Sequence, residues 1–278
     1  MTTAKHRPHA MHPDIDALVP LLKTTAQEEI LPRFARAERS FKPDGSIVTE
    51  VDFAVQNRLA LALKQRYPQF ELLGEEMDEA RQRALLDRAG PGLWCLDPLD
   101  GTSNFAAGLP FFCISLALLR GGEPVLGLIY DPVRDECFAA EKGRGAWLNG
   151  QPLDGHGGGL PLRHGLAMVD FKRLDPALAA ELALHPPYSS HRYLGSGALE
   201  WCWLAAGRFH AYLHGGQKLW DYAAGSLILA EAGGCATSLD GAPILATALK
   251  PTSVVAAANP GLFGEWRAFL APRTARPT

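Results

Sequence analysis

The chain has 278 residues, 47% of them hydrophobic and 21% charged, and its formal net charge is −3. This composition is typical of a globular protein with a large core, built as one large domain or as two tightly packed halves. The slight negative charge without an arginine-rich run argues against a nucleic-acid partner, and no apolar stretch reaches the ~18 residues of a membrane span.

Two predicted helices open the chain. Residues 1–12 lack the apolar segment of a secretory signal, and we expect them to form a disordered tail. Apolar residues recur at helical spacing over residues 14–37, with bends expected at the two prolines of this segment. Thr49 is a predicted N-cap, and Asp52 is its capping-box partner at the start of a second helix.

The next informative segment is Asp97-Pro98-Leu99-Asp100-Gly101-Thr102, which follows an apolar run that predicts a buried strand. Because Pro98 cannot continue a ladder, we expect the chain to turn there and the two carboxylates to point at one place. Two buried carboxylates are unfavourable unless something neutralises them. Oxygen ligands beside N–H and hydroxyl donors favour a divalent cation next to a phosphate.

Short strands separated by turn residues follow, over residues 111–119, 125–130, 136–140 and 146–148, and they predict an antiparallel meander. Residues 151–160 are glycine-rich and indicate a linker or surface loop. Strands and helices then alternate to the C-terminus. We therefore expect an N-terminal α+β half over residues 13–155 with a large antiparallel sheet, and a C-terminal α/β half over residues 156–278.

The five cysteines are scattered in apolar segments and form no Cys-x-x-Cys pair. They indicate reduced thiols in a cytoplasmic protein. The nine histidines lack the spacing of zinc ligands, which argues against a zinc site.

Two further acids lie at element boundaries. Glu75 follows a short predicted strand, and Asp221 begins an apolar helix. Each also has a structural interpretation, because Glu75 fits a solvated loop and Asp221 fits an N-cap. Asp97 and Asp100 could likewise belong to a simple Asp-Pro turn. The residues alone leave these alternatives open.

Three motifs that contain these acids follow one another along the chain: Gly74-Glu75-Glu76, then the run from Trp94 to Phe105, then the run from Trp220 to Gly234. Together they favour the functional interpretation, because their order matches that of a known family. With them, residues 14–270 resemble the inositol monophosphatase family. The resemblance implies an αβαβα layered sandwich of the inositol monophosphatase/fructose-1,6-bisphosphatase type. It also implies a Mg²⁺-dependent, lithium-sensitive phosphatase that forms a homodimer, with the site between the two halves.

The resemblance also assigns roles to single residues. Two or three Mg²⁺ ions would bind per subunit, to Glu75, Asp97, the carbonyl of Leu99, Asp100 and Asp221. The phosphate would lie on the N–H groups of Gly101 and Thr102. Asp52 and the Thr102 hydroxyl would position and help deprotonate the attacking water, with Glu75 as a further catalytic residue.

The substrate alcohol would contact Ser196, Gly197, Ala198, His214 and Arg192. Relatives that prefer inositol have a glutamate where this chain has His214, so strict inositol specificity is in doubt. An inositol monophosphate-like substrate comes first by family frequency. A 3'(2'),5'-bisphosphate nucleotide, histidinol phosphate and a sugar (bis)phosphate are alternatives. A non-enzymatic alternative is a moonlighting binding protein in a transcription complex.

Overall fold

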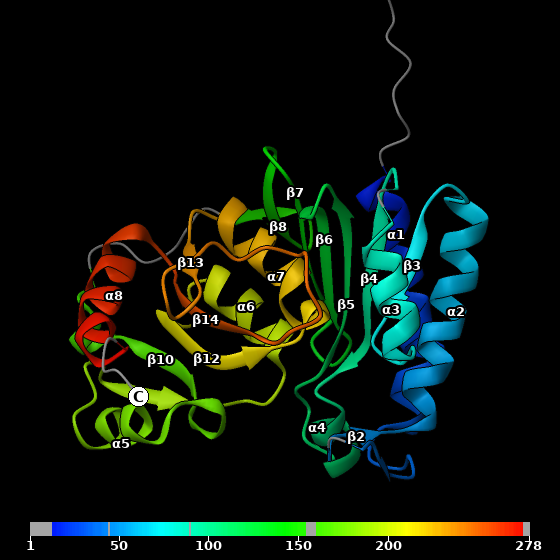
Figure 1. The fold of residues 1–278 in the computed structure, drawn as a ribbon. Helices are drawn as coiled ribbons and strands as arrows, with labels where there is room; N and C mark the ends of the chain where they lie inside the picture. Colours follow the sequence, from blue (N-terminus) through cyan, green and yellow to red (C-terminus); the bar gives the residue numbers. More distant parts are fainter. Residues whose placement is uncertain (1–12, 44, 89, 154–159, 275–278) are drawn as a thin grey trace, which may run out of the picture.

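The computed structural model describes residues 13–43, 45–88, 90–153 and 160–274, so the predicted tail over residues 1–12 lies outside the described part. The described elements form five layers in the order helix, sheet, helix, sheet, helix (Figure 1). The outer layers and the central layer each contain a helix pair: α1 (Ile15–Thr25) with α2 (Glu50–Arg66), α6 (Gly197–Ala205) with α7 (Leu219–Glu231), and α5 (Pro176–Leu184) with α8 (Pro260–Thr274). This arrangement confirms the predicted αβαβα sandwich.

The first sheet has seven strands, in spatial order from β3 to β9. Only β3 and β4 are parallel to each other, and every later neighbour is antiparallel, as the predicted meander requires. The helix α3 (Glu79–Leu86) connects the parallel pair. The strands are β3 (Glu71–Gly74), β4 (Leu93–Asp100), β5 (Cys113–Arg120), β6 (Glu123–Asp131), β7 (Glu136–Glu141), β8 (Gly145–Leu148) and β9 (Gln151–Leu153).

The second sheet has the order β11-β10-β12-β14-β13, with the first three strands parallel and β14 antiparallel to both of its neighbours. Its strands are β10 (Leu166–Asp170), β11 (Ser190–Arg192), β12 (Ala211–Gln217), β13 (Cys235–Thr237) and β14 (Thr252–Ala257). Residues 154–159, which contain the predicted boundary between the halves, lie outside the described residues. The expected loop over 151–160 begins with the unpredicted strand β9.

The first helix differs in detail from its prediction. The helix α1 continues through Pro20 without ending, because the buried Leu18 and Leu22 anchor it to the first sheet and packing outweighs the lost hydrogen bond. The regular α-helix ends at Thr25 and widens into a π-helix over Ala26–Ile30, followed by a 3-10 turn that contains the second proline. A two-stranded hairpin of β1 (Ser40–Phe41) and β2 (Ile47–Val48) then precedes α2.

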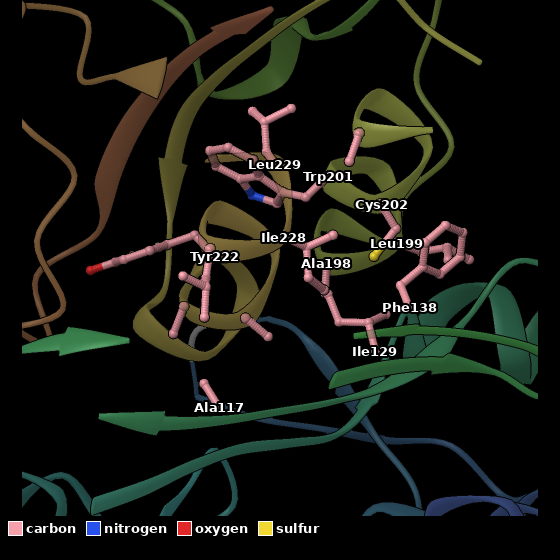
Figure 2. Packing of buried hydrophobic residues seen from close by; sticks show 14 of the residues in the cluster. Ala117, Ile129, Phe138, Ala198, Leu199, Trp201, Cys202, Tyr222, Ile228 and Leu229 are labelled. Carbon is pink, nitrogen blue, oxygen red and sulfur yellow. The ribbon is translucent and has the colours of Figure 1, made fainter. Parts of the chain in front are cut away.

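The central helix layer packs tightly against the first sheet (Figure 2). Gly127 of β6 faces the backbone of α7, and a Cβ there would lie 2.9 Å from the Ala224 carbonyl oxygen. Gly225 of α7 similarly faces Trp201 of α6, where a Cβ would lie 2.4 Å from the Trp201 Cβ. These two glycines let α7 approach both neighbours closely, which fixes the position of the helix that carries Asp221.

Two further properties concern the described residues as a whole. None of their helices combines the length and the apolar character that crossing a membrane requires. All five cysteines belong to this part of the chain and are unpaired, and all except Cys235 are buried.

Candidate metal and phosphate site

The parallel pairing of β3 and β4 places Glu75 beside Asp97. Gly74 pairs with Leu96, and the Glu75 backbone N–H donates to the Leu96 carbonyl oxygen at 3.1 Å. The buried Gln56 accepts from the next backbone N–H at 3.1 Å, and its Oε1 would lie 2.0 Å from a Cβ on Gly74. A side chain at position 74 would therefore displace the Gln56 amide from the backbone N–H of Glu76 that it holds.

The predicted turn at Pro98 is wrong. The strand β4 continues through Pro98 to Asp100, and a shift in its register with β5 lies between Asp97 and Asp100. Such an irregularity accommodates a residue without an N–H donor and redirects the side chains around it. The turn comes one residue after the strand, at Gly101, whose φ of 90° is left-handed.

Three acids converge at this point. Carboxylate oxygens of Asp97, Asp100 and Asp221 all lie within 4.8 Å of one another. Backbone N–H groups orient two of them, from Leu99 to Asp97 Oδ1 at 3.0 Å and from Lys218 to Asp221 Oδ2 at 2.9 Å. Asp221 is thus the third residue of α7 and bonds back to the N-cap residue, instead of being the N-cap itself.

Asp100 is held by the predicted substrate-binding segment. Its Oδ2 accepts from the Ser196 hydroxyl at 2.6 Å and from the Ala198 backbone N–H at 2.7 Å. Gly197 lies between them, and a Cβ there would be 2.6 Å from Gln217 Nε2 and 3.7 Å from Asp221 Cβ. The structure thus brings Ser196, Gly197 and Ala198 to the acidic centre.

Ionising all three carboxylates together is unfavourable. Burial, followed by the charges of neighbouring acids, raises the pKa values of Asp97 and Asp221 well above the ordinary range. Burial also raises the pKa of Asp100 to about 6, although hydrogen bonds to its carboxylate oppose this shift. A cation among these oxygens would relieve the repulsion, and an all-oxygen donor set suits Mg²⁺. The residues present therefore fit the magnesium that the family resemblance implies.

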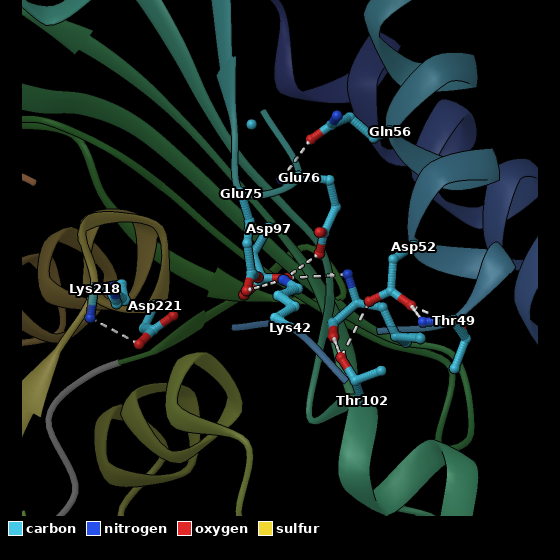
Figure 3. A network of polar contacts seen from close by, with 12 residues as sticks. Lys42, Thr49, Asp52, Gln56, Glu75, Glu76, Asp97, Thr102, Lys218 and Asp221 are labelled. Carbon is cyan, nitrogen blue, oxygen red and sulfur yellow. Dashed lines mark hydrogen bonds and ion pairs between the residues drawn. The ribbon is translucent and has the colours of Figure 1, made fainter. Parts of the chain in front are cut away.

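Glu75 lies beside this group and has a cationic partner that the sequence did not reveal. Lys42 Nζ lies 2.9 Å from Glu75 Oε1 and 2.7 Å from Glu76 Oε1 (Figure 3). Burial raises the pKa of Glu76 to about 7, and the two glutamates raise the pKa of Lys42 against the effect of its own burial. The only sequence signal for Lys42 was its place in a polar loop shortly before Thr49.

Asp52 makes both of its predicted contacts. One oxygen, Oδ2, accepts from the Thr49 backbone N–H at 2.8 Å and from the Thr49 hydroxyl at 2.7 Å, which forms the capping box. The other oxygen, Oδ1, accepts from the Thr102 hydroxyl at 3.1 Å (Figure 3). Thr102 also lies 2.9 Å from the Leu99 carbonyl oxygen, so its single proton alternates between two acceptors.

The other two predicted substrate residues are engaged by their own neighbours. His214 is 5% exposed, its Nε2 lies 3.2 Å from Asp170 Oδ2, and its Nδ1 accepts from the Gly216 backbone N–H at 3.1 Å. Burial lowers the pKa of His214 to about 4, so the ring is neutral at physiological pH. Arg192 is exposed and donates to the Ser190 hydroxyl and the His191 carbonyl oxygen.

Glu200 holds the loop that leads into the acidic centre. It is fully buried, and its Oε1 accepts from the backbone N–H groups of Leu194 at 2.9 Å and Gly195 at 3.1 Å. Burial raises its pKa to about 7. Its carboxylate therefore orders the loop that delivers Ser196, and it is not open to a substrate.

Comparison with known proteins agrees with this geometry. The profile of the inositol monophosphatase family matches residues 11–273. A protein from Xylella fastidiosa named Nus factor SuhB is 36% identical over 70% of this chain and 70% of its own length. Inositol monophosphatase 1 of Solanum lycopersicum is 35% identical over 78% of this chain and 79% of its own. The solved structure of a 2'AMP-bound inositol monophosphatase II from Staphylococcus aureus has a TM-score of 0.78, with 28% identity over 93% of this chain and 94% of that one.

Proposed function

This chain belongs to the inositol monophosphatase family of metal-dependent phosphatases, and from this premise we propose that it is a Mg²⁺-dependent phosphomonoesterase acting on a small phosphorylated alcohol. The observation that carries the proposal is the convergence of Asp97, Asp100 and Asp221 within 4.8 Å. Their raised pKa values mark a site that favours cations.

The residues around this centre have distinct roles in the proposed reaction. Asp97, Asp100 and Asp221 would hold Mg²⁺, together with Glu75 and the Leu99 carbonyl. When bound, Mg²⁺ supplies positive charge that stabilises the phosphoryl oxygens and the leaving alkoxide. The backbone N–H groups of Gly101 and Thr102 would orient the phosphate on the same side.

The proposed nucleophile is water, without a covalent enzyme intermediate. The Thr102 hydroxyl, which lies 3.1 Å from Asp52 Oδ1, would accept a hydrogen bond from this water. The water proton would pass through Thr102 to the Asp52 carboxylate. Burial raises the pKa of Asp52, which makes its carboxylate a better proton acceptor than an exposed aspartate. The water oxygen would attack phosphorus in line with the departing alcohol oxygen.

Other properties of the protein belong to the same proposal. We propose two or three Mg²⁺ ions per subunit, inhibition by Li⁺ and a homodimeric assembly, as the resemblance implies. The five unpaired cysteines support a reducing, cytoplasmic location. An inositol monophosphate-like compound remains the first substrate to test. The 3'(2'),5'-bisphosphate nucleotide, histidinol phosphate and sugar (bis)phosphate named above follow.

A second candidate function comes from the name of a relative. Nus factor SuhB from Xylella fastidiosa, at 36% identity, is named for a role in transcription. This name weighs against the expectation that the chain has no nucleic-acid partner. A transcription-associated binding role is therefore the second candidate, beside phosphatase activity.

The decisive experiment compares Asp97→Asn with the wild type in a phosphate-release assay over a Mg²⁺ titration. Loss of a charged ligand should lower kcat/KM more than the ~10–100-fold that follows loss of a residue behind a ligand. Asp16→Asn removes an exposed acid of α1 and serves as the matched control, with expected wild-type activity. Full activity of the Asp97 variant would refute the metal mechanism.

A further inference from the structure

A second polar cluster adjoins the acidic centre where the end of β12 meets the turn after β10. Arg173 ends this turn, and its backbone packs so closely on Gly215 of β12 that a Cβ there would lie 1.7 Å from the Arg173 carbonyl oxygen. Two residues further along β12, Gln217 Nε2 lies 2.6 Å from the Cβ position of Gly197, and this position lies 3.7 Å from Asp221 Cβ. The end of β12 therefore contacts both Arg173 and the segment beside the proposed metal site.

A buried carboxylate fixes the Arg173 side chain. Asp170 is 1% exposed, and its Oδ2 lies 2.6 Å from Arg173 Nη1 and 3.2 Å from His214 Nε2. The other oxygen accepts from the Lys172 backbone N–H at 3.0 Å. Asp170 is thus enclosed by the protein, and a ligand cannot reach its negative charge.

The outer face of the cluster is cationic and aromatic. The Arg173 side chain is 46% exposed, and it lies close to the hydroxyl of Tyr193, a residue that is 50% exposed. A guanidinium has five N–H donors in a planar fork, so further donors face outward beside those used within the protein. His214 has both ring nitrogens engaged and offers no group to a sugar hydroxyl.

We propose that Arg173 and Tyr193 recognise a second phosphate group on the substrate, while the phosphate to be removed lies at Asp97, Asp100 and Asp221. The inference rests on the proposed phosphatase function and narrows its substrate class to bisphosphates. An arginine fork suits phosphate because it forms two parallel charged hydrogen bonds. Asp170 holds that fork in place before the substrate binds, which limits the entropy lost on binding.

Matched substrate pairs test the inference in the full-length protein with Mg²⁺. One pair is fructose 1-phosphate and fructose 1,6-bisphosphate, and the other is adenosine 2'-monophosphate and adenosine 2',5'-bisphosphate. We expect kcat/KM to be at least ~10-fold higher for the bisphosphate of one pair, and that pair identifies a sugar or a nucleoside as the carrier. Arg173→Gln should reduce this preference ~10-fold or more, mainly through a higher KM for the bisphosphate, while kcat/KM for the monophosphate falls by less.

Two further variants keep the test decisive. Lys172→Gln removes the same charge from the adjacent residue and should keep the preference. Arg173→Lys keeps the charge but not the fork, and an intermediate preference is expected. If Arg173→Gln does not fold, the comparison of Arg173→Lys with wild type decides. Equal kcat/KM for both members of each pair, or an equal loss for both members in the Arg173 variants, would overturn the inferred recognition of a second phosphate. Either result would leave the proposed phosphatase function intact. Turnover of inositol 1-phosphate but of none of the four compounds would also overturn the inference alone, whereas failure on inositol 1-phosphate and all four compounds, with and without Mg²⁺, would count against the proposed function itself.

Discussion

Asp52 serves two neighbours, one through each carboxylate oxygen. Oδ2 completes the cap of α2 through Thr49. Oδ1 accepts a hydrogen bond from the hydroxyl of Thr102, which lies 50 residues later in the chain. The structural and the catalytic interpretations of this residue are therefore compatible, because the two oxygens point to different partners. A comparison of variants at Thr49 and at Asp52 can separate the capping role from the catalytic role.

Thr49→Ala removes the capping hydroxyl and leaves Thr102 beside Asp52. It should lower the free energy of unfolding by about 1 kcal/mol, with activity close to wild type. Asp52→Ala should cost similar stability and lower kcat by ~10²–10⁴-fold, the usual contribution of a general base. Urea unfolding and phosphate release measure the two effects. An equal loss of activity in both variants would show that Asp52 acts only through the helix cap.

At the scale of elements, the spacing between α7 and β6 determines where Asp221 lies. A Cβ on Gly127 would meet the backbone of Ala224 at 2.9 and 3.0 Å, and a backbone atom cannot move aside as a flexible side chain can. The helix would have to shift away from the sheet. Asp221 is on α7, whereas Asp97 and Asp100 are on β4, so such a shift would separate the three carboxylates.

Gly127→Ala should therefore destabilise the protein by about 1–3 kcal/mol, as overpacking of a core does. It should also weaken the binding of Mg²⁺, measured by calorimetry on the folded variant. Gly264→Ala is the control, because Gly264 is an exposed residue of α8 with open space around its Cβ position. Replacing a helical glycine there should stabilise by roughly 0.5–1 kcal/mol. Unchanged stability and Mg²⁺ affinity in Gly127→Ala would show that the added Cβ is accommodated without displacing α7 or Asp221.

At the scale of the whole molecule, the buried cluster of Asp97, Asp100 and Asp221 makes the stability of the protein depend on pH. Burial and repulsion among neighbouring acids raise the pKa of Asp100 to about 6 and raise the pKa values of Asp97 and Asp221 well above their ordinary range. The folded protein thus retains protons that the unfolded chain has released. Without metal, its stability should be highest below the ordinary carboxyl range near pH 4 and fall as the pH rises through about 6.

Mg²⁺ competes with these protons, so it should stabilise the protein more at about pH 8 than at about pH 5. At a concentration 100 times Kd, the expected gain at the higher pH is about 2.7 kcal/mol. Thermal unfolding with and without Mg²⁺ at both values measures it. Asp97→Asn should reduce the gain, and a gain in wild type that does not change with pH would argue against carboxylate ligands.

Short-range features of this molecule could be predicted from the residues themselves, whereas long-range contacts were predicted only where the family resemblance supplied them, as for Asp52 with Thr102. The capping box at Thr49 and the meander depend on residues a few positions apart, and both were predicted correctly. The bonds from Lys42 to Glu75 and Glu76 span 33 and 34 residues, and the contact between Asp170 and His214 joins two strands. The resemblance pointed to Asp221, but the contact of His214 Nε2 with Asp170 follows only from the pairing of β10 with β12.

The close approach of α7 to the first sheet has a consequence for how the protein loses function. The proposed ligands come from a strand of the first sheet and from the helix packed on that sheet, so they meet only while the two layers stay packed together. A partial separation of the layers would release bound cations before much helix or strand had melted. Cation release should therefore be an early signal of unfolding, detectable ahead of the change in circular dichroism.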